Sequence, residues 1–479
     1  MILDTDLYFY LQNNIQMEQA QVTILGAGIS GLATAYWLQK KGVRVRILES
    51  RSEAGGSMQS ERKDGFLIDY GPNSGLDTSP LIGQLVEELG LQDQMLFANQ
   101  EAKKRYILKH GRLVPLPTSP FAFLGTSLFS TSAKFRLLKE PFIGKTDPTQ
   151  DVSIADFVRH RLGEEFLTNA IDPFISGIYA GDPEKLSVKS ALPRLYALEE
   201  KYGGLIKGAI AGTRERKKNP EKSKQSAQQF SFKEGMQTLP NALAEYMKAS
   251  VEYNCRVKQI SRGGDQYRIV VEKDGQEETI TTPLLLSTIP AYHLSGSVRE
   301  MDSQLATHLE ALYYPPVMVM YLGFRRESIR QPLDGFGFLI PGQERRAFLG
   351  AIWSSVIFPH RTDAQHAAFT VFVGGSRNRD LLEQDLDLKK QEVIREFKQL
   401  MMIPETDEPV LIDSKLWPKA IPQYNIGYQK HEAYFQAFEK AHPGFFLGGN
   451  FRGGISVSDC IKNSGVQSER ILKYVKELV

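Results

Sequence analysis

Short apolar runs, glycine-rich turns and a helical pattern follow one another at the start of the chain. Val22–Leu25 is a short, mostly apolar run that suits a buried strand, and a helical pattern covers about residues 30–41. Gly42 stands where a helix commonly ends. Residues 43–50 (VRVRILES) then alternate between apolar and polar positions. Strand, turn, helix and strand in this order predict the beginning of a parallel sheet with α/β architecture.

The middle of the chain predicts a helical region that contains one hairpin. Residues 77–95 and 119–210 have mostly helical patterns, and residues 105–117 (RYILKHGRLVPLP) predict a hairpin that turns at His110-Gly111. Residues 214–229 are charged and poor in apolar side chains, which predicts a flexible loop.

Strand patterns return in the second half of the chain. Residues 249–290 alternate and end in the buried-strand run PLLLSTIP, and several strand-like runs lie between residues 316 and 376. These runs predict a second, antiparallel sheet. The chain ends with FFLGGN (residues 445–450), a glycine-rich turn and a helix to Val479.

The composition is that of a soluble protein of 479 residues with a net charge of +2. This length predicts two or three domains, and the near-neutral charge gives no reason to expect nucleic acid as a partner. Cys255 and Cys460 cannot form a disulfide framework, so a reducing, cytoplasmic compartment fits. The histidines lack metal-ligand spacing, and we expect no metal site. No apolar run predicts a membrane-spanning helix, and residues 1–20 do not resemble a signal peptide.

The first glycine-rich turn has the pattern of a dinucleotide site. Residues 26–31 (GAGISG) match G-x-G-x-x-G, which allows a tight turn and lets a pyrophosphate approach the N–H groups at the start of the helix. Glu49, at the end of the second strand, can accept hydrogen bonds from a ribose. The alternatives are a glycine turn that only packs a helix on a strand and an ordinary strand-end charge. We expect Gly26, Gly28, Ile29, Ser30, Gly31 and Glu49 to bind the dinucleotide.

Six further segments resemble motifs of the flavin-dependent protoporphyrinogen oxidases and occur in the order of that family. They are DPFISGIYAGDPEKLSV (172–188), ALPRLYALEEKYGGLIKGAI (191–210), FKEGMQTLPNAL (232–243), GFGFLIP (335–341), LGAIWSSVIFPHR (349–361) and WPKAIPQYNIGY (417–428). Generic flavin amine oxidases share the first and last glycine motifs but not these middle segments. The resemblance covers nearly the whole chain from Val22 and implies FAD, bound without a covalent link, as the cofactor.

The resemblance assigns three more segments to the FAD site. Gly55-Gly56 would let the backbone pass close to the pyrophosphate, and Gly71-Pro72-Asn73 lies on a loop that leaves a strand. Residues 447–465 (LGGNFRGGISVSDCIKNSG) resemble the strand and helix that cover the isoalloxazine, with the helix N-terminus aimed at the flavin pyrimidine. Plain loops are the alternative, and many relatives have Lys or Arg in place of Ser57. The residues added from these segments are Gly55, Gly56, Ser57, Gly71, Pro72, Asn73, Gly449, Asn450, Ile455 and Val457, and the resemblance also adds Val257 and Trp417 from elsewhere in the chain.

The implied fold class is α/β, with a Rossmann-like FAD-binding domain of the flavin amine oxidase superfamily, an antiparallel-sheet substrate domain and a helical membrane-associated domain. The FAD-binding domain would comprise residues 17–86, 225–290 and 413–479. The helical domain would comprise residues 87–210 and the substrate domain residues 291–412. The residues before Met17 are expected to be dispensable.

The helical domain is expected to attach to the surface of a membrane. Residues 116–142 combine clustered aromatic side chains with Lys134, Arg136 and Lys139, a mixture that suits an interface. The alternative is a helical subdomain that only packs on the core.

The resemblance also implies a set of substrate-binding residues. Arg105 matches the family arginine that pairs with a propionate, which a guanidinium fork can bind. Trp353 stands where the family commonly has a Phe that stacks on the macrocycle, and Leu339 would be an apolar clamp. Gly177 and Ala180 would let the backbone approach the substrate. The alternatives are an exposed hairpin charge for Arg105 and core packing for Trp353 and Leu339.

The implied activity is the oxygen-dependent, six-electron oxidation of protoporphyrinogen IX to protoporphyrin IX in haem biosynthesis. FAD would accept hydride and hydrogen peroxide would be the by-product. No catalytic side chain is expected, because the sequence offers no triad. The alternatives are coproporphyrinogen III oxidation, an amine oxidase, and a tetrapyrrole-binding flavoprotein without turnover. The expected partners are a porphyrinogen, dioxygen and a membrane surface in the cytoplasm, and a homodimer is left open.

Overall fold

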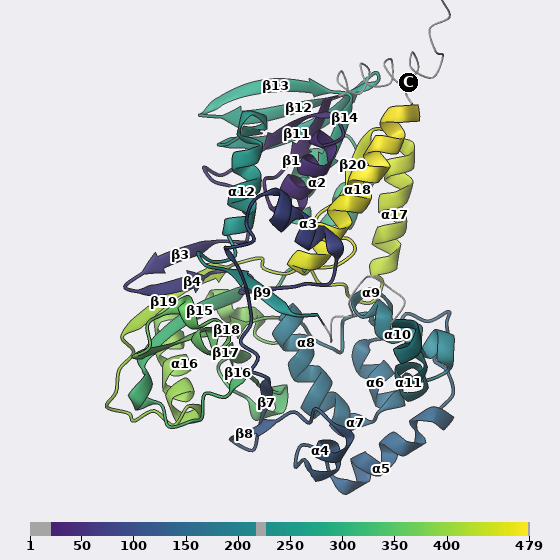
Figure 1. The fold of residues 1–479 in the computed structure, drawn as a ribbon. Coiled ribbons are helices and arrows are strands. Elements are labelled where there is room, and N and C mark those ends of the chain that lie inside the picture. The colour runs from purple at the N-terminus through teal and green to yellow at the C-terminus, as the bar shows by residue number, and fades with distance from the viewer. Residues whose placement is uncertain (1–20, 217–226, 478–479) are drawn as a thin grey trace, which may run out of the picture.

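A parallel sheet at one end of the molecule is the framework of the predicted dinucleotide site (Figure 1). The structure is a computed structural model that describes residues 21–216 and 227–477. Its strands run parallel in the order β10 (Val251–Glu252), β2 (Arg44–Leu48), β1 (Gln21–Leu25), β14 (Leu284–Ser287) and β20 (Phe445–Leu447). Every residue of β14 and β20 is buried, as in strands covered on both faces.

Helices cover one side of this sheet and a small antiparallel sheet contacts it (Figure 1). Helix α2 (Ile29–Gln39) packs on α18 (Val457–Glu477), and both contact further helices, α12 (Thr238–Tyr246) and α3 (Pro80–Glu88) respectively. The small sheet is formed by β11 (Cys255–Gly263), β12 (Gln266–Lys273) and β13 (Gln276–Thr282). Segments far apart in sequence therefore build one flavin-type fold.

A larger sheet of seven strands forms the second layer of the molecule. Its order is β19 (Leu411–Trp417), β15 (Val317–Arg325), β18 (His366–Gly374), β17 (Gly350–Ile352), β16 (Gly335–Leu339), β7 (Lys104–Lys109) and β8 (Arg112–Pro115). All neighbours are antiparallel except β16 and β7. Helix α16 (Leu386–Leu400) packs on it through Phe397, whose ring lies 5.0 Å from that of Phe369.

The third part is a group of helices beside the seven-stranded sheet (Figure 1). It contains α4 (Pro120–Gly125), α5 (Thr131–Lys139), α6 (Ile154–Arg161), α7 (Glu164–Phe166), α8 (Asp172–Tyr179), α9 (Val188–Ala191), α10 (Pro193–Tyr202) and α11 (Leu205–Arg216). Arg161 is fully buried among them, where its Nε donates to Glu199 at 2.6 Å. Glu140, also buried, accepts the Leu205 N–H at the start of α11 at 2.7 Å. Each of these buried charges has several partners, so the loss of one partner would leave another charge unpaired in the interior.

The remaining strands and α-helices connect these three parts. They are β3 (Ser60–Lys63) and β4 (Phe66–Asp69), a three-stranded sheet of β5 (Gly75–Leu76), β9 (Gln229–Phe232) and β6 (Met95–Phe97), and the helices α13 (Ala291–Val298), α14 (Ser303–Glu310), α15 (Ser354–Ile357) and α17 (Tyr428–Ala441).

The predicted α/β fold class is confirmed, and so are the two N-terminal strands with the helix between them and the second sheet. The hairpin turns at His110-Gly111 as expected, but β7 and β8 join the seven-stranded sheet rather than the helices around them in sequence. The predicted loop at 214–229 is wrong at its two ends, because α11 continues to Arg216 and β9 begins at Gln229, and its residues 217–226 lie outside the described residues. The expectations for residues 1–20, including the start at Met17, lie outside the described residues.

Candidate functional site

The glycines of the first turn have different structural tasks. Gly26 has φ +97°, and its N–H donates to Leu48 O at 2.8 Å. A Cβ on Gly31 would lie 2.1 Å from Gly26 O, so close packing of helix on turn requires a glycine there. A Cβ on Gly28, at the N-cap of α2, would meet no atom within 4 Å. The structure therefore leaves space at Gly28, in front of the helix N-terminus, where a pyrophosphate would bind. Ile29 and Ser30 begin the helix behind it.

Glu49 is held firmly at the end of β2. Its side chain is buried, and one carboxylate oxygen accepts the Ala27 N–H at 2.8 Å while the other accepts the Arg51 N–H at 2.9 Å. The Glu49 carbonyl accepts the Cys255 N–H at the start of β11, which places half-buried Val257 two residues further along that strand. An anchored carboxylate at the carboxyl end of a Rossmann strand suits a ribose diol.

The second glycine pair lies directly against the first turn. Gly55 donates to Ala27 O at 2.9 Å, and a Cβ on Gly56 would lie 3.4 Å from the Gly28 Cα. Ser57 has an exposed side chain, but its carbonyl would be 1.9 Å from a Cβ on Gly71. The first two predicted segments and the loop of Gly71, Pro72 and Asn73 are thus in contact through their backbones.

The loop that follows β4 is held mainly by the seven-stranded sheet. Trp417 Nε1 donates to Tyr70 O at 2.8 Å, and Thr370 Oγ1 donates to Asn73 Oδ1 at 2.8 Å. Arg361 Nη2 donates to Asn73 O at 3.2 Å. The structure therefore brings Trp417 to the loop of Asn73.

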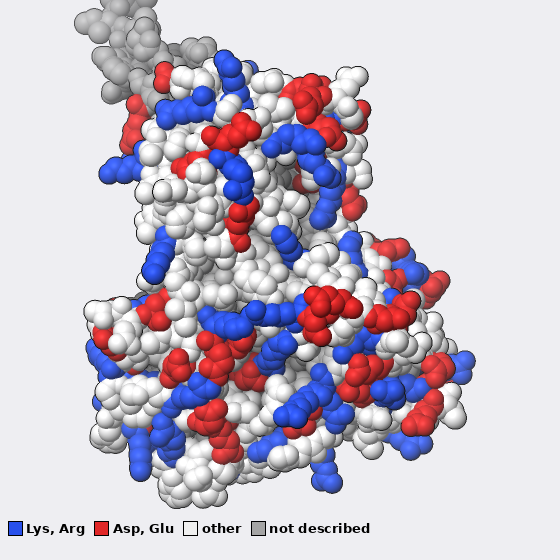
Figure 2. All heavy atoms as spheres, turned by 180° about the vertical axis from the view of Figure 1, so that it is seen from behind, with Lys and Arg blue, Asp and Glu red and all other residues white. Residues whose placement is uncertain are grey.

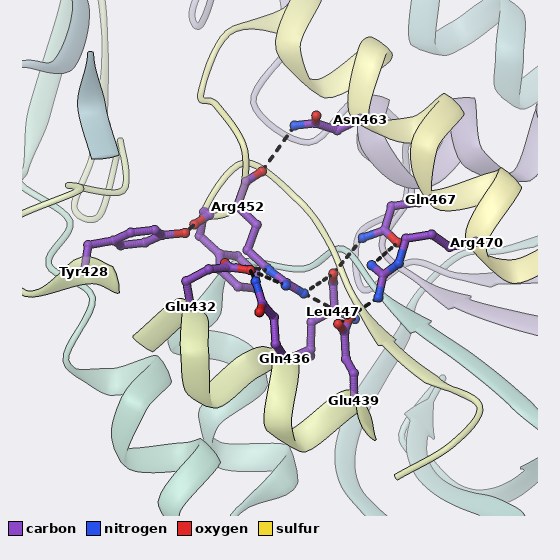
Figure 3. Close-up of polar contacts among 10 residues, drawn as sticks. Tyr428, Glu432, Gln436, Glu439, Leu447, Arg452, Asn463, Gln467 and Arg470 are labelled. Carbon is purple, nitrogen blue, oxygen red and sulfur yellow. Dashed lines mark hydrogen bonds and ion pairs between the residues drawn. The ribbon is translucent and has the colours of Figure 1, made fainter. Parts of the chain in front are cut away.

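The C-terminal glycine turn follows β20, and side chains from α17 and its approach hold its backbone. Gly449 has φ +98°, and a Cβ there would lie 2.9 Å from Thr288 O. Tyr424 Oη donates to Asn450 O at 2.7 Å and accepts the Gly454 N–H at 3.0 Å. Tyr428 Oη donates to Phe451 O at 2.5 Å (Figure 3). The turn is thereby fixed along most of its length.

Arg452 is the centre of a network at the same turn (Figure 3). Its guanidinium donates to Glu432 at 3.0 Å through Nε and, through Nη1, to Glu439 at 2.9 Å and to Leu447 O at 2.8 Å. Burial alone would lower the pKa of Arg452, but the hydrogen bonds and charges of the two glutamates raise it, so the group stays charged. Arg470 reaches Glu439 from the outer side at 2.9 Å.

Helix α18 starts immediately after this turn. Ser456 Oγ accepts the Asp459 N–H at 3.1 Å and donates to the Asp459 carboxylate at 2.7 Å, which caps the helix. Val457 is buried and Ile455 half-buried at this end. Burial raises the pKa of Cys460 to about 11, so its thiol is a packing group.

Three of the four predicted substrate residues lie in one region. Arg105 is exposed on β7, with its guanidinium 5.3 Å from the centre of the Phe336 ring. Its strand neighbour is Gly337 of β16, two residues before Leu339. A Cβ on Gly177 would lie 2.5 Å from Leu339 Cδ2, so α8 and β16 are in close contact there.

Trp353 is placed differently from the other three. It is fully buried, and its ring lies 5.6 Å from that of Tyr106, the neighbour of Arg105 whose side chain points to the opposite face of β7. This is the position of a core aromatic and offers a ligand no access. The difference arises because the turn after β17 directs Trp353 inward, which its place in a motif does not reveal.

Several residues that hold the site were not predicted as part of it, namely Tyr424, Tyr428, Arg452, Arg361 and Thr370. Tyr424 and Tyr428 lie in WPKAIPQYNIGY and Arg361 ends LGAIWSSVIFPHR, so their positions in motifs were a signal. Thr370 lies in an ordinary strand and carried no such signal.

Among residues 21–216 and 227–477 no group of three or more His, Cys, Asp or Glu could hold a metal ion. Within the same residues no helix has the length and apolar character needed to cross a bilayer.

Acidic and basic side chains are mixed over the face drawn in Figure 2, without a large area of one sign.

Comparisons with known proteins agree with this geometry. The family model described as flavin containing amine oxidoreductase matches residues 29–471. Protoporphyrinogen oxidase 2 of Arabidopsis thaliana is 32% identical over 95% of this chain and 94% of its own length. Coproporphyrinogen III oxidase of Bacillus subtilis (strain 168) is 28% identical over 95% of this chain and 98% of its own length. A crystal structure from Exiguobacterium sp. 255-15 has a TM-score of 0.78 at 23% identity and covers 95% of this chain and 98% of the other, which shows the shared fold.

Proposed function

Because the chain belongs to the family of flavin-containing amine oxidoreductases, we propose that this FAD-dependent oxidoreductase oxidises protoporphyrinogen IX to protoporphyrin IX. The observation that carries the proposal is the similarity to protoporphyrinogen oxidase 2 of Arabidopsis thaliana over nearly the full length of both chains. The amine oxidase alternative lacks this support, since the putrescine oxidase structures that share the fold are at most 16% identical.

The residues described above fit FAD. Space at Gly28 and the close backbone contacts of Gly55, Gly56 and Gly71 would accommodate the pyrophosphate, and Glu49 would bind the ribose. The turn at Gly449 and Asn450 would lie along the flavin. When bound, FAD supplies the acceptor for a hydride from the substrate.

The protein's part in this reaction is binding and orientation. Three two-electron oxidations convert the porphyrinogen to the porphyrin, and three dioxygen molecules are reduced to three hydrogen peroxide molecules. Arg105 would pair with a propionate, and Leu339 and Gly177 would contact the ring. No described side chain is assigned as a proton acceptor. The chain would therefore act by holding the substrate in a fixed position against the cofactor.

Turnover of the two porphyrinogens tests the substrate. We expect the purified holoenzyme to convert protoporphyrinogen IX with a higher kcat/KM than coproporphyrinogen III, measured aerobically as the rise in porphyrin fluorescence. The reverse order would favour the activity for which the Bacillus subtilis relative is named. Anaerobic mixing that leaves the flavin oxidised with both substrates would contradict either activity.

We further propose that the α4–α5 region attaches to a membrane surface. Five apolar side chains here are more than half exposed: Phe121 (87%), Leu124 (67%), Phe135 (64%), Leu138 (67%) and Phe142 (88%). Arg136 and Lys139 lie among them, and this mixture of apolar and basic side chains suits a lipid interface. In flotation with anionic liposomes, wild type should enter the lipid fraction, and Phe121→Ser/Phe142→Ser should not. Wild type that stays at the bottom of the gradient would refute attachment.

A further inference from the structure

A line of three side chains connects the seven-stranded sheet with the loop after β4. Ser354, at the start of α15, has its Oγ 2.8 Å from the Oγ1 of Thr370 on β18. Thr370 Oγ1 is in turn 2.8 Å from Asn73 Oδ1. Ser354 and Thr370 are both buried, at 3% and 0% exposure, so these contacts are protected from competing water.

The direction of every hydrogen bond in this line can be derived. Asn73 Nδ2 lies 3.2 Å from Gly71 O, and a carbonyl can only accept, so the amide nitrogen must face Gly71. Asn73 Oδ1 therefore faces Thr370 and accepts its single hydroxyl hydrogen. Since that hydrogen is used, Thr370 must accept from Ser354. The line thus runs from Ser354 to Thr370 to Asn73 and sets the orientation of the carboxamide.

A second contact, from the segment between α15 and β18, fixes the backbone of Asn73. Arg361 Nη2 donates to Asn73 O at 3.2 Å and to Ser231 Oγ at 2.7 Å, while Nη1 lies 2.5 Å from Asp69 Oδ2. Asp69 Oδ1 accepts the Met236 N–H at 3.0 Å. The side chains of Arg361 and Asp69 are 2% and 1% exposed. A buried pair with this many partners has one preferred arrangement, so Asn73 is held at both its side chain and its carbonyl.

We propose that Thr370 is a positioning residue for the FAD site, which acts by orienting the Asn73 carboxamide. The inference rests on the proposed placement of Asn73 at FAD. The Gly71 contact uses one of the two Nδ2 hydrogens and leaves the second for a bound cofactor. The donor left available to the cofactor is thereby set by a hydroxyl on the sheet that also carries Arg105, and Thr370 would influence both the retention of FAD and its reduction potential.

Three variants of the full-length holoenzyme test this role. Thr370→Val keeps the shape of the side chain but removes the hydroxyl, and Thr370→Ser keeps the hydroxyl. Thr362→Val is the matched control, because Thr362 Oγ1 is buried and finds no hydrogen-bond partner within residues 21–216 and 227–477. The measurements are the rate of FAD release, the reduction potential of the bound flavin and the melting temperature.

We expect Thr370→Val to release FAD roughly 5- to 30-fold faster, which corresponds to the loss of about one hydrogen bond. The reduction potential of its flavin should also shift. Thr370→Ser should release FAD within about threefold of the wild-type rate. Thr362→Val should keep the wild-type release rate and potential. A Thr370→Val enzyme with wild-type FAD release and potential would overturn the proposal. So would a Thr370→Ser enzyme that behaves like Thr370→Val, because the hydroxyl would then not be the active feature.

A further variant keeps the test valid if Thr370→Val does not fold. Ser354→Ala leaves the Thr370–Asn73 contact in place but removes the donor that fixes the Thr370 hydroxyl. FAD release should therefore be faster and the flavin potential should shift, both by less than in Thr370→Val. An unchanged potential and FAD release in Ser354→Ala would then count against the proposal. None of these measurements uses a porphyrinogen, so an error in the proposed substrate would not affect their outcome.

Discussion

The two glycine turns at the FAD site are built in opposite ways. The first, at residues 26–31, is held mainly by backbone contacts: Gly26 N–H bonds to Leu48 O, and Gly31 packs on Gly26 O, while Glu49 adds one side-chain bond to the Ala27 N–H. The second, at residues 449–454, is held by side chains that come from outside it, among them Tyr424, Tyr428 and the Arg452 network. A short motif and the strand that follows it can therefore specify most of the first turn, whereas the second depends on α17 being in place.

This difference implies different responses to mutation. A turn made by backbone contacts fails only where a side chain is added to a crowded glycine. A turn made by side chains can be loosened one interaction at a time, with the fold around it intact. The Arg452 network offers such a graded set of contacts, from mostly buried to exposed.

The largest effect is expected from Gly31→Val. The new Cβ would lie 2.1 Å from Gly26 O, where no flexible side chain can move aside, so destabilisation should exceed about 4 kcal/mol. Gly28→Val is the matched variant: its Cβ meets no atom within 4 Å, so the protein should fold but not bind FAD. Thermal unfolding and the flavin absorbance distinguish the two. A yellow Gly28→Val protein would show that the pyrophosphate does not lie there.

Arg452→Met should have the next largest effect. It leaves Glu432 and Glu439 without their central partner in a mostly buried position, which typically costs about 3 kcal/mol or more. FAD should be released faster because the second turn loosens, while the first turn is unchanged. Arg470→Met removes a 41%-exposed partner of the same Glu439 and should cost less than about 1 kcal/mol. Equal losses of stability in urea unfolding for the two variants would contradict this ranking.

Arg105→Ala tests whether the substrate region is independent of both turns. A lost guanidinium–propionate pair should raise KM for the porphyrinogen roughly 3- to 30-fold, less than for a buried pair because Arg105 is exposed. FAD content should not change. Arg105→Lys should recover part of the affinity, and Arg112→Ala, an exposed arginine on the same hairpin, should behave like wild type. A wild-type KM for Arg105→Ala would exclude it from the substrate site.

The smallest effect is expected from pH, and at the second turn it acts through α17. Burial lowers the pKa of His431 on α17 below its ordinary value of 6.5, and His308 and Lys430 lower it further. As the pH falls, the unfolded chain therefore takes up the proton before the folded chain does. The stability that depends on neutral His431 is present above pH 6.5 and is lost as the pH falls through the folded pKa.

Hydrogen-exchange protection measured at pH 7 and pH 5 tests this effect. Amides of α17 should lose protection in acid more than those of α2, and His431→Gln should reduce the difference. Equal loss in α2 and α17 would assign the acid response to the whole fold.

The fold was predictable where local pattern decides structure. Gly28 and Glu49 could be placed from the spacing of one strand, helix and strand. Trp353 could not be placed, because the direction of its side chain depends on the turn after β17. The hairpin of Arg105 could not be placed either, because its strand β7 pairs with β16, which lies more than 200 residues away in sequence. Thr370 is a residue of an ordinary strand, and only the approach of Asn73 gives it a role.

The pairing of β1 with β14, and of β14 with β20, has a consequence for biosynthesis. The first glycine turn leaves the ribosome long before the second, and at typical rates of synthesis the interval is roughly 20 to 90 seconds. During that time the helices with exposed Phe121 and Phe142 are already made, while the flavin fold still lacks β20 and α18. Cofactor capture should therefore follow release of the chain, and ribosome-bound nascent protein should contain no flavin.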